Sequence, residues 1–197
     1  MYLGERGAQV TLENTDPLSV IVGPDLVRRY NAREQRFLFG RAAFELRNRL
    51  ALTRRLDAQQ LADLLGNTIR VVSPSFDRLG RPDAEASKRL RKAMSGKAIK
   101  QLEQLLPELN STRTFDVPAW LQAMSLTADR AGLLLATDIG AVLQMLFRED
   151  PSVSGMRIDN TEQLVQAVRK RRDFSELLVF VLSDDYARLR GKLKLGL

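Results

Sequence analysis

Leu56-Asp-Ala-Gln-Gln-Leu-Ala-Asp-Leu-Leu-Gly-Asn-Thr-Ile-Arg-Val-Val72 is the stretch that decides the fold. Its large apolar residues recur every three or four positions, so they share one face of a helix. Asp57 stands directly before this pattern and is a good N-cap for a helix over residues 58–72. Similar spacing continues through most of the chain, and the sequence therefore predicts a mostly helical protein.

Further helical patterns lie on both sides of this stretch. A stripe through Phe37, Gly40 and Phe44 predicts a helix over about residues 32–52. A third helix is expected to begin at Asp83 and to end before a loop that starts at Pro107. The remaining helices are expected at about residues 117–136, 139–148 and 161–172, with a loop over 149–160 and one or two more helical turns within 175–189.

The N-terminal part of the chain has the pattern of strands. Ala8, Val10 and Leu12 alternate with polar neighbours, and the apolar run 18–22 follows. Asn14-Thr-Asp-Pro17 between these segments is typical of a turn. We therefore expect a small antiparallel hairpin over residues 7–22 and a mostly α (α+β) fold class.

The length of 197 residues fits one large domain. We expect a single domain over 1–197, with the hairpin in 1–24, a helical core in 25–150 and C-terminal helices in 151–197. No apolar run approaches the ~20 residues needed to span a bilayer, and residues 1–9 lack the apolar core of a signal peptide. The sequence therefore predicts no membrane span and a cytoplasmic location.

Histidine and cysteine are both absent from the chain. Their absence removes the usual general base, the Ser-His-Asp arrangement and thiolate or imidazole zinc sites. No phosphate-binding glycine motif is present, and Asp129 has no second acid one helical turn away. We therefore expect a protein that is not an enzyme, holds no metal or cofactor, and acts by binding.

The net charge of +7 favours an anionic partner. Two clusters carry much of the basic character: Lys88, Arg89, Arg91 and Lys92, and Arg169, Lys170, Arg171 and Arg172. Neither cluster has the interleaved aromatic residues of a single-strand binder. Binding of nucleic acid or of an anionic surface is therefore the alternative function, less favoured than binding of another protein.

Two segments resemble a known family when they are taken together. The stretch from Leu56 to Val72 and the later Ser125-Leu-Thr-Ala-Asp-Arg-Ala-Gly-Leu-Leu134 are similar to zinc endopeptidases of the CAAX prenyl protease and heat-shock membrane protease family. In that family one helix carries H-E-x-x-H, and a later helix carries E-x-x-A-D-R-x-G, whose glutamate is the third zinc ligand. Glu34-Gln-Arg-Phe-Leu-Phe-Gly-Arg41 is similar to the helix that precedes the metal helix, so the resemblance covers about residues 33–146.

The metal-site positions of that family are all replaced in this chain. The two histidines fall at Asn67 and Val71, the general base at Thr68 and the third ligand at Ser125. The resemblance implies that these residues cluster beside Asp129, which here pairs with an arginine, and that they form a candidate binding cleft with the hairpin. It also implies that helix 58–72 packs on helix 117–136 through Leu64, Leu65, Ala128 and Leu133.

The resemblance thus implies a catalytically dead metallopeptidase-like domain that serves protein–protein interaction or scaffolding. Similar degenerate domains lie at the C-terminal ends of long bacterial tetratricopeptide-repeat proteins, and we expect this chain to be a fragment of such a protein. The rival expectation is that the former cleft is filled and that the domain only caps neighbouring repeats.

Overall fold

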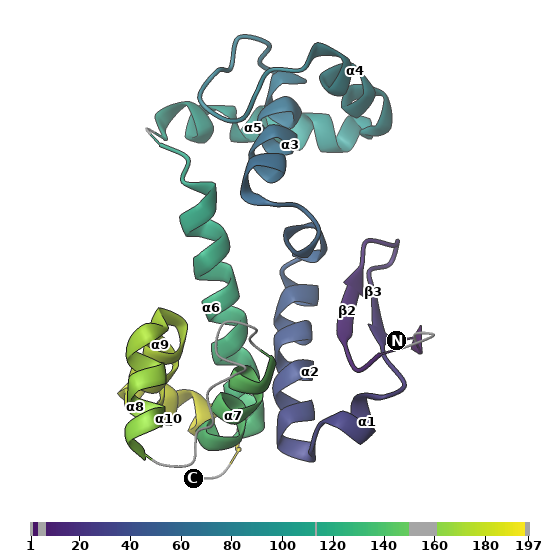
Figure 1. Cartoon of the computed structure of the whole chain (residues 1–197). Coiled ribbons are helices and arrows are strands. Elements are labelled where there is room, and N and C mark those ends of the chain that lie inside the picture. Colours follow the sequence, from purple (N-terminus) through teal and green to yellow (C-terminus); the bar gives the residue numbers. More distant parts are fainter. Residues whose placement is uncertain (1, 4–6, 113, 150–160, 196–197) are drawn as a thin grey trace. The chain divides into compact units, whose positions relative to one another are not determined.

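The computed structural model describes residues 2–3, 7–112, 114–149 and 161–195 (Figure 1). The chain divides into two compact units: unit 1 comprises Met1–Ala51 and Ala123–Leu197, and unit 2 comprises Leu52–Gln122. The segment boundaries expected at residues 24 and 150 both fall inside unit 1.

Helices dominate both units, as the sequence predicts. The strands are β1 (Tyr2–Leu3), β2 (Val10–Glu13) and β3 (Ser19–Val22). The helices are α1 (Leu26–Arg29), α2 (Ala32–Arg47), the 3-10 helix η1 (Ala51–Arg54), α3 (Ala58–Arg70), α4 (Ala84–Ala93), α5 (Gly96–Ser111), α6 (Val117–Ala136), α7 (Ile139–Glu149), α8 (Thr161–Lys170), α9 (Arg172–Val181) and α10 (Asp184–Lys192).

The expected hairpin is confirmed. Strands β2 and β3 pair antiparallel, with Val10 opposite Val22 and Leu12 opposite Val20. The sequence did not predict β1, which pairs with β3 in parallel and makes the strand order β1-β3-β2. The hairpin lies beside α2 (Figure 1), where Leu12 packs with Ala42 of that helix.

Unit 1 has its main core between α2, α6, α7 and α9. Phe37, Leu133, Met145 and Leu177 are at most 1% exposed and pack in one cluster. A second cluster continues it, in which Phe147 of α7 meets Phe174 of α9 edge-to-face with the ring centroids 4.5 Å apart. The apolar faces of these helices therefore account for most of the buried core of unit 1.

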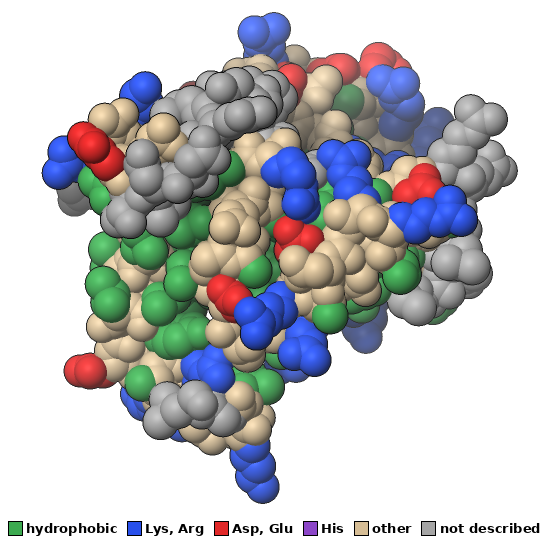
Figure 2. Space-filling view, turned by 60° about the horizontal axis from the view of Figure 1, so that its bottom comes forward, with side chains coloured by type: hydrophobic (Ala, Val, Ile, Leu, Met, Phe, Trp, Pro, Cys, Tyr) green, Lys and Arg blue, Asp and Glu red, His purple; other side chains and the backbone are tan. Residues whose placement is uncertain are grey.

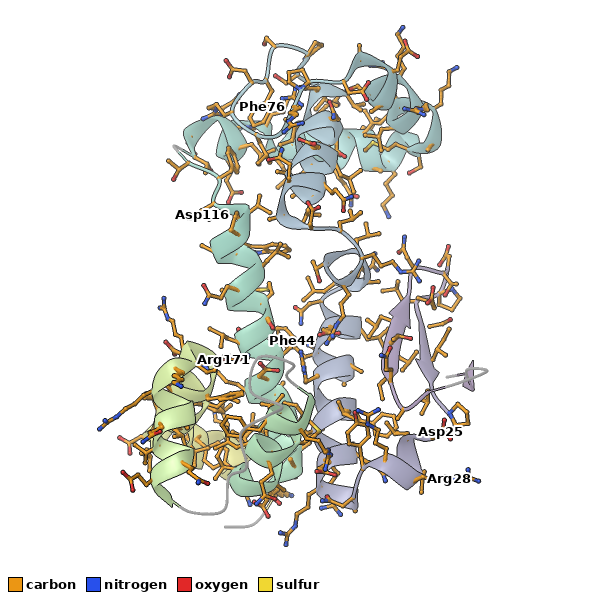
Figure 3. The ribbon with its side chains drawn as sticks, in the orientation of Figure 1. Asp25, Arg28, Phe44, Phe76, Asp116 and Arg171 are labelled. Carbon is orange, nitrogen blue, oxygen red and sulfur yellow. The ribbon has the colours of Figure 1, made fainter. Side chains whose placement is uncertain are left out.

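Unit 2 is smaller, and its core is thinner. Leu61 and Ile69 of α3 pack with Phe76, Leu79 and Val117. Phe76 stands in the loop after α3 (Figure 3), and its ring meets Phe115 edge-to-face at 5.8 Å. Helices α4 and α5 contain no fully buried residue, so much of their apolar surface is only half covered.

The predicted third helix is wrong in two respects. The structure breaks it into α4 and α5 at Met94, because Ser95 accepts the backbone N–H of Ala98 and caps a new helix. The predicted end at Pro107 is also wrong, since α5 continues through that proline to Ser111. The expected loop over 149–160 lies almost wholly outside the described residues.

Candidate functional site

Helix α3 begins with a complete capping box. The side chain of Asp57 accepts the backbone N–H of Gln60 at 2.8 Å, and the backbone N–H of Asp57 donates to the side chain of Gln60 at 3.0 Å. This box fixes the rotation of the helix at its first turn. Leu61 and Ile69 then point into the core of unit 2, while Leu64 and Asn67 line the side that α4 covers.

Asn67 is a buried polar residue, and both ends of its side-chain amide are hydrogen-bonded. Its Nδ2 donates to the carbonyl of Arg81 at 3.1 Å, and its Oδ1 accepts the backbone N–H of Asp83 at 2.8 Å. The hydroxyl of Ser87 donates to the carbonyl of Asn67 at 3.2 Å. One side chain on α3 therefore positions the beginning of α4.

Arg70 fastens the loop that returns from α3 to α4. Its buried guanidinium donates to the main-chain carbonyls of Phe76 at 2.8 Å, Leu79 at 2.9 Å and Gly80 at 3.0 Å. These carbonyl dipoles solvate the buried charge. Gly66 lets the loop approach closely, because a Cβ at that position would lie 2.0 Å from the carbonyl oxygen of Leu79.

Helix α4 packs beside α3. Asp83 and Ser87 bond to Asn67, and further along both helices the guanidinium of Arg91 donates to the carbonyl of Val71 at 3.2 Å. An open groove of about 430 Å³ lies between the two helices. It is mainly apolar and is lined by Asp63, Leu64, Asn67, Asp83, Ala86, Arg89, Leu90 and Ala93.

The lining of this groove, hereafter the α3–α4 groove, carries charges of both signs. Asp63 lies in the middle of α3 and Asp83 is the N-cap of α4, and each carboxylate accepts a backbone N–H. Asp63 accepts the backbone N–H of Arg81 at 2.6 Å, which is the main reason that its pKa is lowered, and Asp83 caps α4 through Ala86. Both carboxylates keep their negative charge, because a backbone N–H is neutral. The lining therefore carries two acids and one cation, Arg89, which makes no hydrogen bond or ion pair with the described residues.

The arrangement suits binding rather than bond-making chemistry. The polar lining atoms of Asn67 and the two carboxylates are held by neighbouring backbone groups. An apolar side chain that enters the groove therefore displaces water from Leu64, Leu90 and the alanines without leaving a buried polar group unpaired.

The structure assigns the predicted site residues to both units. Asn67 lines the α3–α4 groove, Thr68 donates to the carbonyl of Leu64 at 2.8 Å, and Val71 is buried at the end of α3. Ser125 and Asp129 stand on the part of α6 that belongs to unit 1, and Ser125 is exposed. The clustering of these five residues stays a prediction.

The residues predicted to pack helix 58–72 on helix 117–136 also belong to different units. Leu64 and Leu65 belong to unit 2, whereas Ala128 and Leu133 belong to unit 1. Leu133 packs with Phe37 in the core of unit 1, and Leu65 is 39% exposed. This packing also stays a prediction.

Asp129 forms the expected pair with an arginine. Its Oδ1 lies 2.9 Å from Nε of Arg41, and both side chains are largely buried. The pair lies where α2 crosses α6 at two glycines: a Cβ on Gly132 would be 2.6 Å from the carbonyl oxygen of Phe37, and a Cβ on Gly40 would be 2.7 Å from Cα of Gly132. Two of the segments that carry the family resemblance thus form a close helix crossing in unit 1.

The two basic clusters differ in how far they are neutralised. On α4, Lys88 pairs with Glu85 at 2.8 Å, whereas Arg89 and Lys92 make no hydrogen bond or ion pair with the described residues. In unit 1, two hydrogen bonds join Arg171 to Asp173, and these raise the pKa of the guanidinium. Arg172 lies 3.7 Å from Glu176.

Positive charges do not gather into one patch on the face of the molecule drawn in Figure 2. On the face in Figure 2, Lys and Arg side chains are scattered, with acidic and hydrophobic side chains between them. The strongest local excess in the sequence is on α4 and the start of α5, where residues 84–100 hold six cations and one acid.

Sequence reasoning missed most of the α3–α4 groove. Arg70 and Asp63 gave no signal, because their partners lie in a loop that is distant along the chain. One signal was available at Gly66, since a glycine inside a strong helical pattern often marks a close approach of another backbone.

The described residues contain neither a candidate metal site nor a candidate membrane span. No three acidic side chains of this part of the chain lie close enough to hold a metal ion. No helix there is both long and apolar enough to cross a membrane. Neither a family model, nor a curated protein, nor a solved structure matches the chain.

Proposed function

We propose that this chain is a non-catalytic protein-binding domain and that it receives its partner in the α3–α4 groove. The observation that carries the proposal is the open, mainly apolar groove of about 430 Å³, in which the side chains of Asn67, Asp63 and Asp83 are already hydrogen-bonded. Concave, mainly apolar sites with few polar groups are the usual form of binding sites. Descent from a zinc peptidase and a cytoplasmic location remain parts of the same proposal.

The resemblance lends this proposal some support. Asn67 lines the groove and stands at the position of the family's first histidine. On this proposal, the position that binds the metal in the family here positions α4 instead. The absence of histidine and cysteine supports a function without catalysis. The rival role is a cap on neighbouring repeats, in which no partner enters the α3–α4 groove.

A groove-filling variant tests the proposal. Ala93 is exposed and lines the groove, so Ala93→Trp occupies the site without entering the core. Ala84→Trp places the same side chain on an exposed position of the same helix outside the lining, and it is the matched control. Both variants and the wild type are used for affinity capture from the native cell, followed by binding measurements with the purified partner.

The proposal predicts that one protein binds to the wild type and to Ala84→Trp and is lost on Ala93→Trp. Circular dichroism spectra that agree among the three proteins exclude misfolding as the cause. Equal capture by all three would contradict the proposal and would favour the capping role.

A second candidate function is the binding of nucleic acid or of another polyanion. The six cations in residues 84–100 favour it, because phosphate contacts come chiefly from Lys and Arg. Salt separates the two functions: affinity for a nucleic acid falls steeply between about 50 and 200 mM salt, whereas apolar groove binding changes little. Binding of a single-stranded RNA oligonucleotide that is unaffected by Ala93→Trp would support this candidate.

A further inference from the structure

The charges around the α3–α4 groove indicate which class of partner fits it. Arg89 lines the groove, and Lys92 lies one helical turn from Arg89 as an exposed residue of α4. Neither cation makes a hydrogen bond or ion pair with the described residues. The lining carboxylates of Asp63 and Asp83 keep their negative charge, but each already accepts a backbone N–H. A ligand therefore meets two cations that are not yet paired, in a segment, residues 84–100, that holds six cations and one acid.

The apolar part of the lining has the spacing of a helical face. Ala86, Leu90 and Ala93 follow one another at intervals of four and three residues on α4, and Leu64 faces them from α3. The small alanines leave room for large side chains of a ligand in the open channel between the two helices. An amphipathic helix laid in such a channel inserts residues spaced by three and four.

We propose that the α3–α4 groove receives an acidic amphipathic helix of a partner protein, whose apolar side chains enter between Leu64 and Leu90 and whose carboxylates pair with Arg89 and Lys92. The inference rests on the proposed function and adds the chemical class of the partner. Lys97 and Lys100 at the start of α5 are exposed and also free of partners among the described residues, so they extend the positive field that attracts such a helix.

Two synthetic peptides of about 15 residues provide the test, a length at which isolated helices begin to form. The first has leucines at every third or fourth position and glutamates at most others. The second replaces each glutamate with lysine. Fluorescence anisotropy of labelled peptides measures the Kd with the full chain as wild type, Ala93→Trp, Ala84→Trp, Arg89→Glu/Lys92→Glu and, as a charge control in unit 1, Lys192→Glu.

We expect the acidic peptide to bind and the lysine peptide not to bind. Ala93→Trp should weaken the acidic peptide at least about thirtyfold, as for a filled hot-spot pocket, and Arg89→Glu/Lys92→Glu about tenfold. Ala84→Trp and Lys192→Glu should leave the Kd within about twofold. Raising the salt concentration should reduce the effect of the charge variant, because exposed ion pairs are screened.

Other outcomes overturn the inference, and they distinguish it from the proposed function. If both peptides bind and both are lost on Ala93→Trp, the groove binds proteins but does not select acidic ones. If neither peptide responds to Ala93→Trp, the groove does not bind a helix and the inference fails, whereas the proposed function is decided separately by capture of a partner on the wild type and its loss on Ala93→Trp. If the chain self-associates and Ala93→Trp abolishes this, the occupant is a second copy. If an RNA oligonucleotide displaces the acidic peptide and binds Ala93→Trp equally well, the cations serve nucleic acid.

Discussion

The crossing of α2 and α6 in unit 1 depends on Gly132, and Gly132→Ala tests this directly. A Cβ at this position would lie 2.6 Å from the carbonyl oxygen of Phe37 and 2.7 Å from its ring atom Cδ2. Real Cβ atoms essentially never have a contact shorter than 3.0 Å. The nearest atom belongs to the backbone of α2, which cannot rotate away. The two helices must therefore separate, and the ion pair of Arg41 with Asp129 moves with them.

Two opposing terms decide the size of the effect. Overpacking of a core by one methyl group costs about 1–3 kcal/mol, and occasionally more. Replacement of glycine by alanine inside a helix returns about 1 kcal/mol. Because the clash is with backbone, we expect the upper part of the first range and a net loss of about 1–2 kcal/mol in the free energy of unfolding.

The matched control is Gly191→Ala in α10, also in unit 1. A Cβ at Gly191 has no atom within 4 Å, so only the helix-propensity term applies and a gain of up to about 1 kcal/mol is expected. Urea unfolding followed by circular dichroism measures both variants, with hydrogen exchange of the α2 and α6 amides to identify the affected unit. A Gly132→Ala protein as stable as Gly191→Ala would refute the close crossing.

Four further predictions concern single residues and metal content. Asn67→Ala should destabilise unit 2 by about 2 kcal/mol, because it leaves the groups bonded to Asn67 without partners, and the fluorescence of Trp120, the single tryptophan, reports this during urea unfolding. Asp129→Asn should lower the free energy of unfolding by about 2–4 kcal/mol, because it leaves Arg41 as a buried charge. A double-mutant cycle with Arg41→Met should show coupling between the two residues, and additive losses would argue against the pair. The pKa of Asp138 is lowered by the backbone N–H of Ala141 and by Arg33, so its ionised form stabilises unit 1 at pH values above the ordinary pKa of 3.8. This stabilisation is lost as the pH falls through the lower pKa of the folded state, so the melting temperature of Asp138→Asn should fall less on acidification than that of the wild type. Protein purified without a chelator should contain no stoichiometric zinc by elemental analysis, and zinc that is lost on Asn67→Ala would contradict a non-catalytic function.

Helix beginnings were the most predictable part of the fold, because they depend on residues that are close in sequence. Asp57 and Gln60 form the capping box at the beginning predicted for α3. Asp116 likewise accepts the backbone N–H of Ala119 at the beginning of α6 (Figure 3). In both helices a short polar side chain meets backbone groups that the helix itself leaves free.

Periodicity gave the wrong length where it continued across a break. The apolar residues Leu90, Ala98 and Leu102 keep helical spacing through Met94, although the chain turns there. The cap at Ser95 was the local signal for a new helix, and a smooth apolar stripe concealed it. Apolar spacing reports which face is covered, whereas a break depends on individual backbone hydrogen bonds.

The candidate site was less predictable than the fold. Asn67 was identified through a resemblance to metal-site positions, but its bonds to Arg81 and Asp83 depend on how the loop returns. The groove needs α4 to lie against α3, which no local pattern in the sequence encodes. Contacts between residues that are distant along the chain decide such sites.

The division of the chain has a consequence for its synthesis on the ribosome. Unit 2 is contiguous, whereas unit 1 is interrupted between Ala51 and Ala123. At about 5–20 residues per second, roughly five to twenty seconds separate the emergence of Phe37 from that of Leu133, its packing partner. During this interval α2 is a nascent helix without its partner, and all of unit 2 is translated before α6 is complete. The order of translation thus favours unit 2 as the first part to fold, with the N-terminal half of unit 1 held open until the chain returns to it.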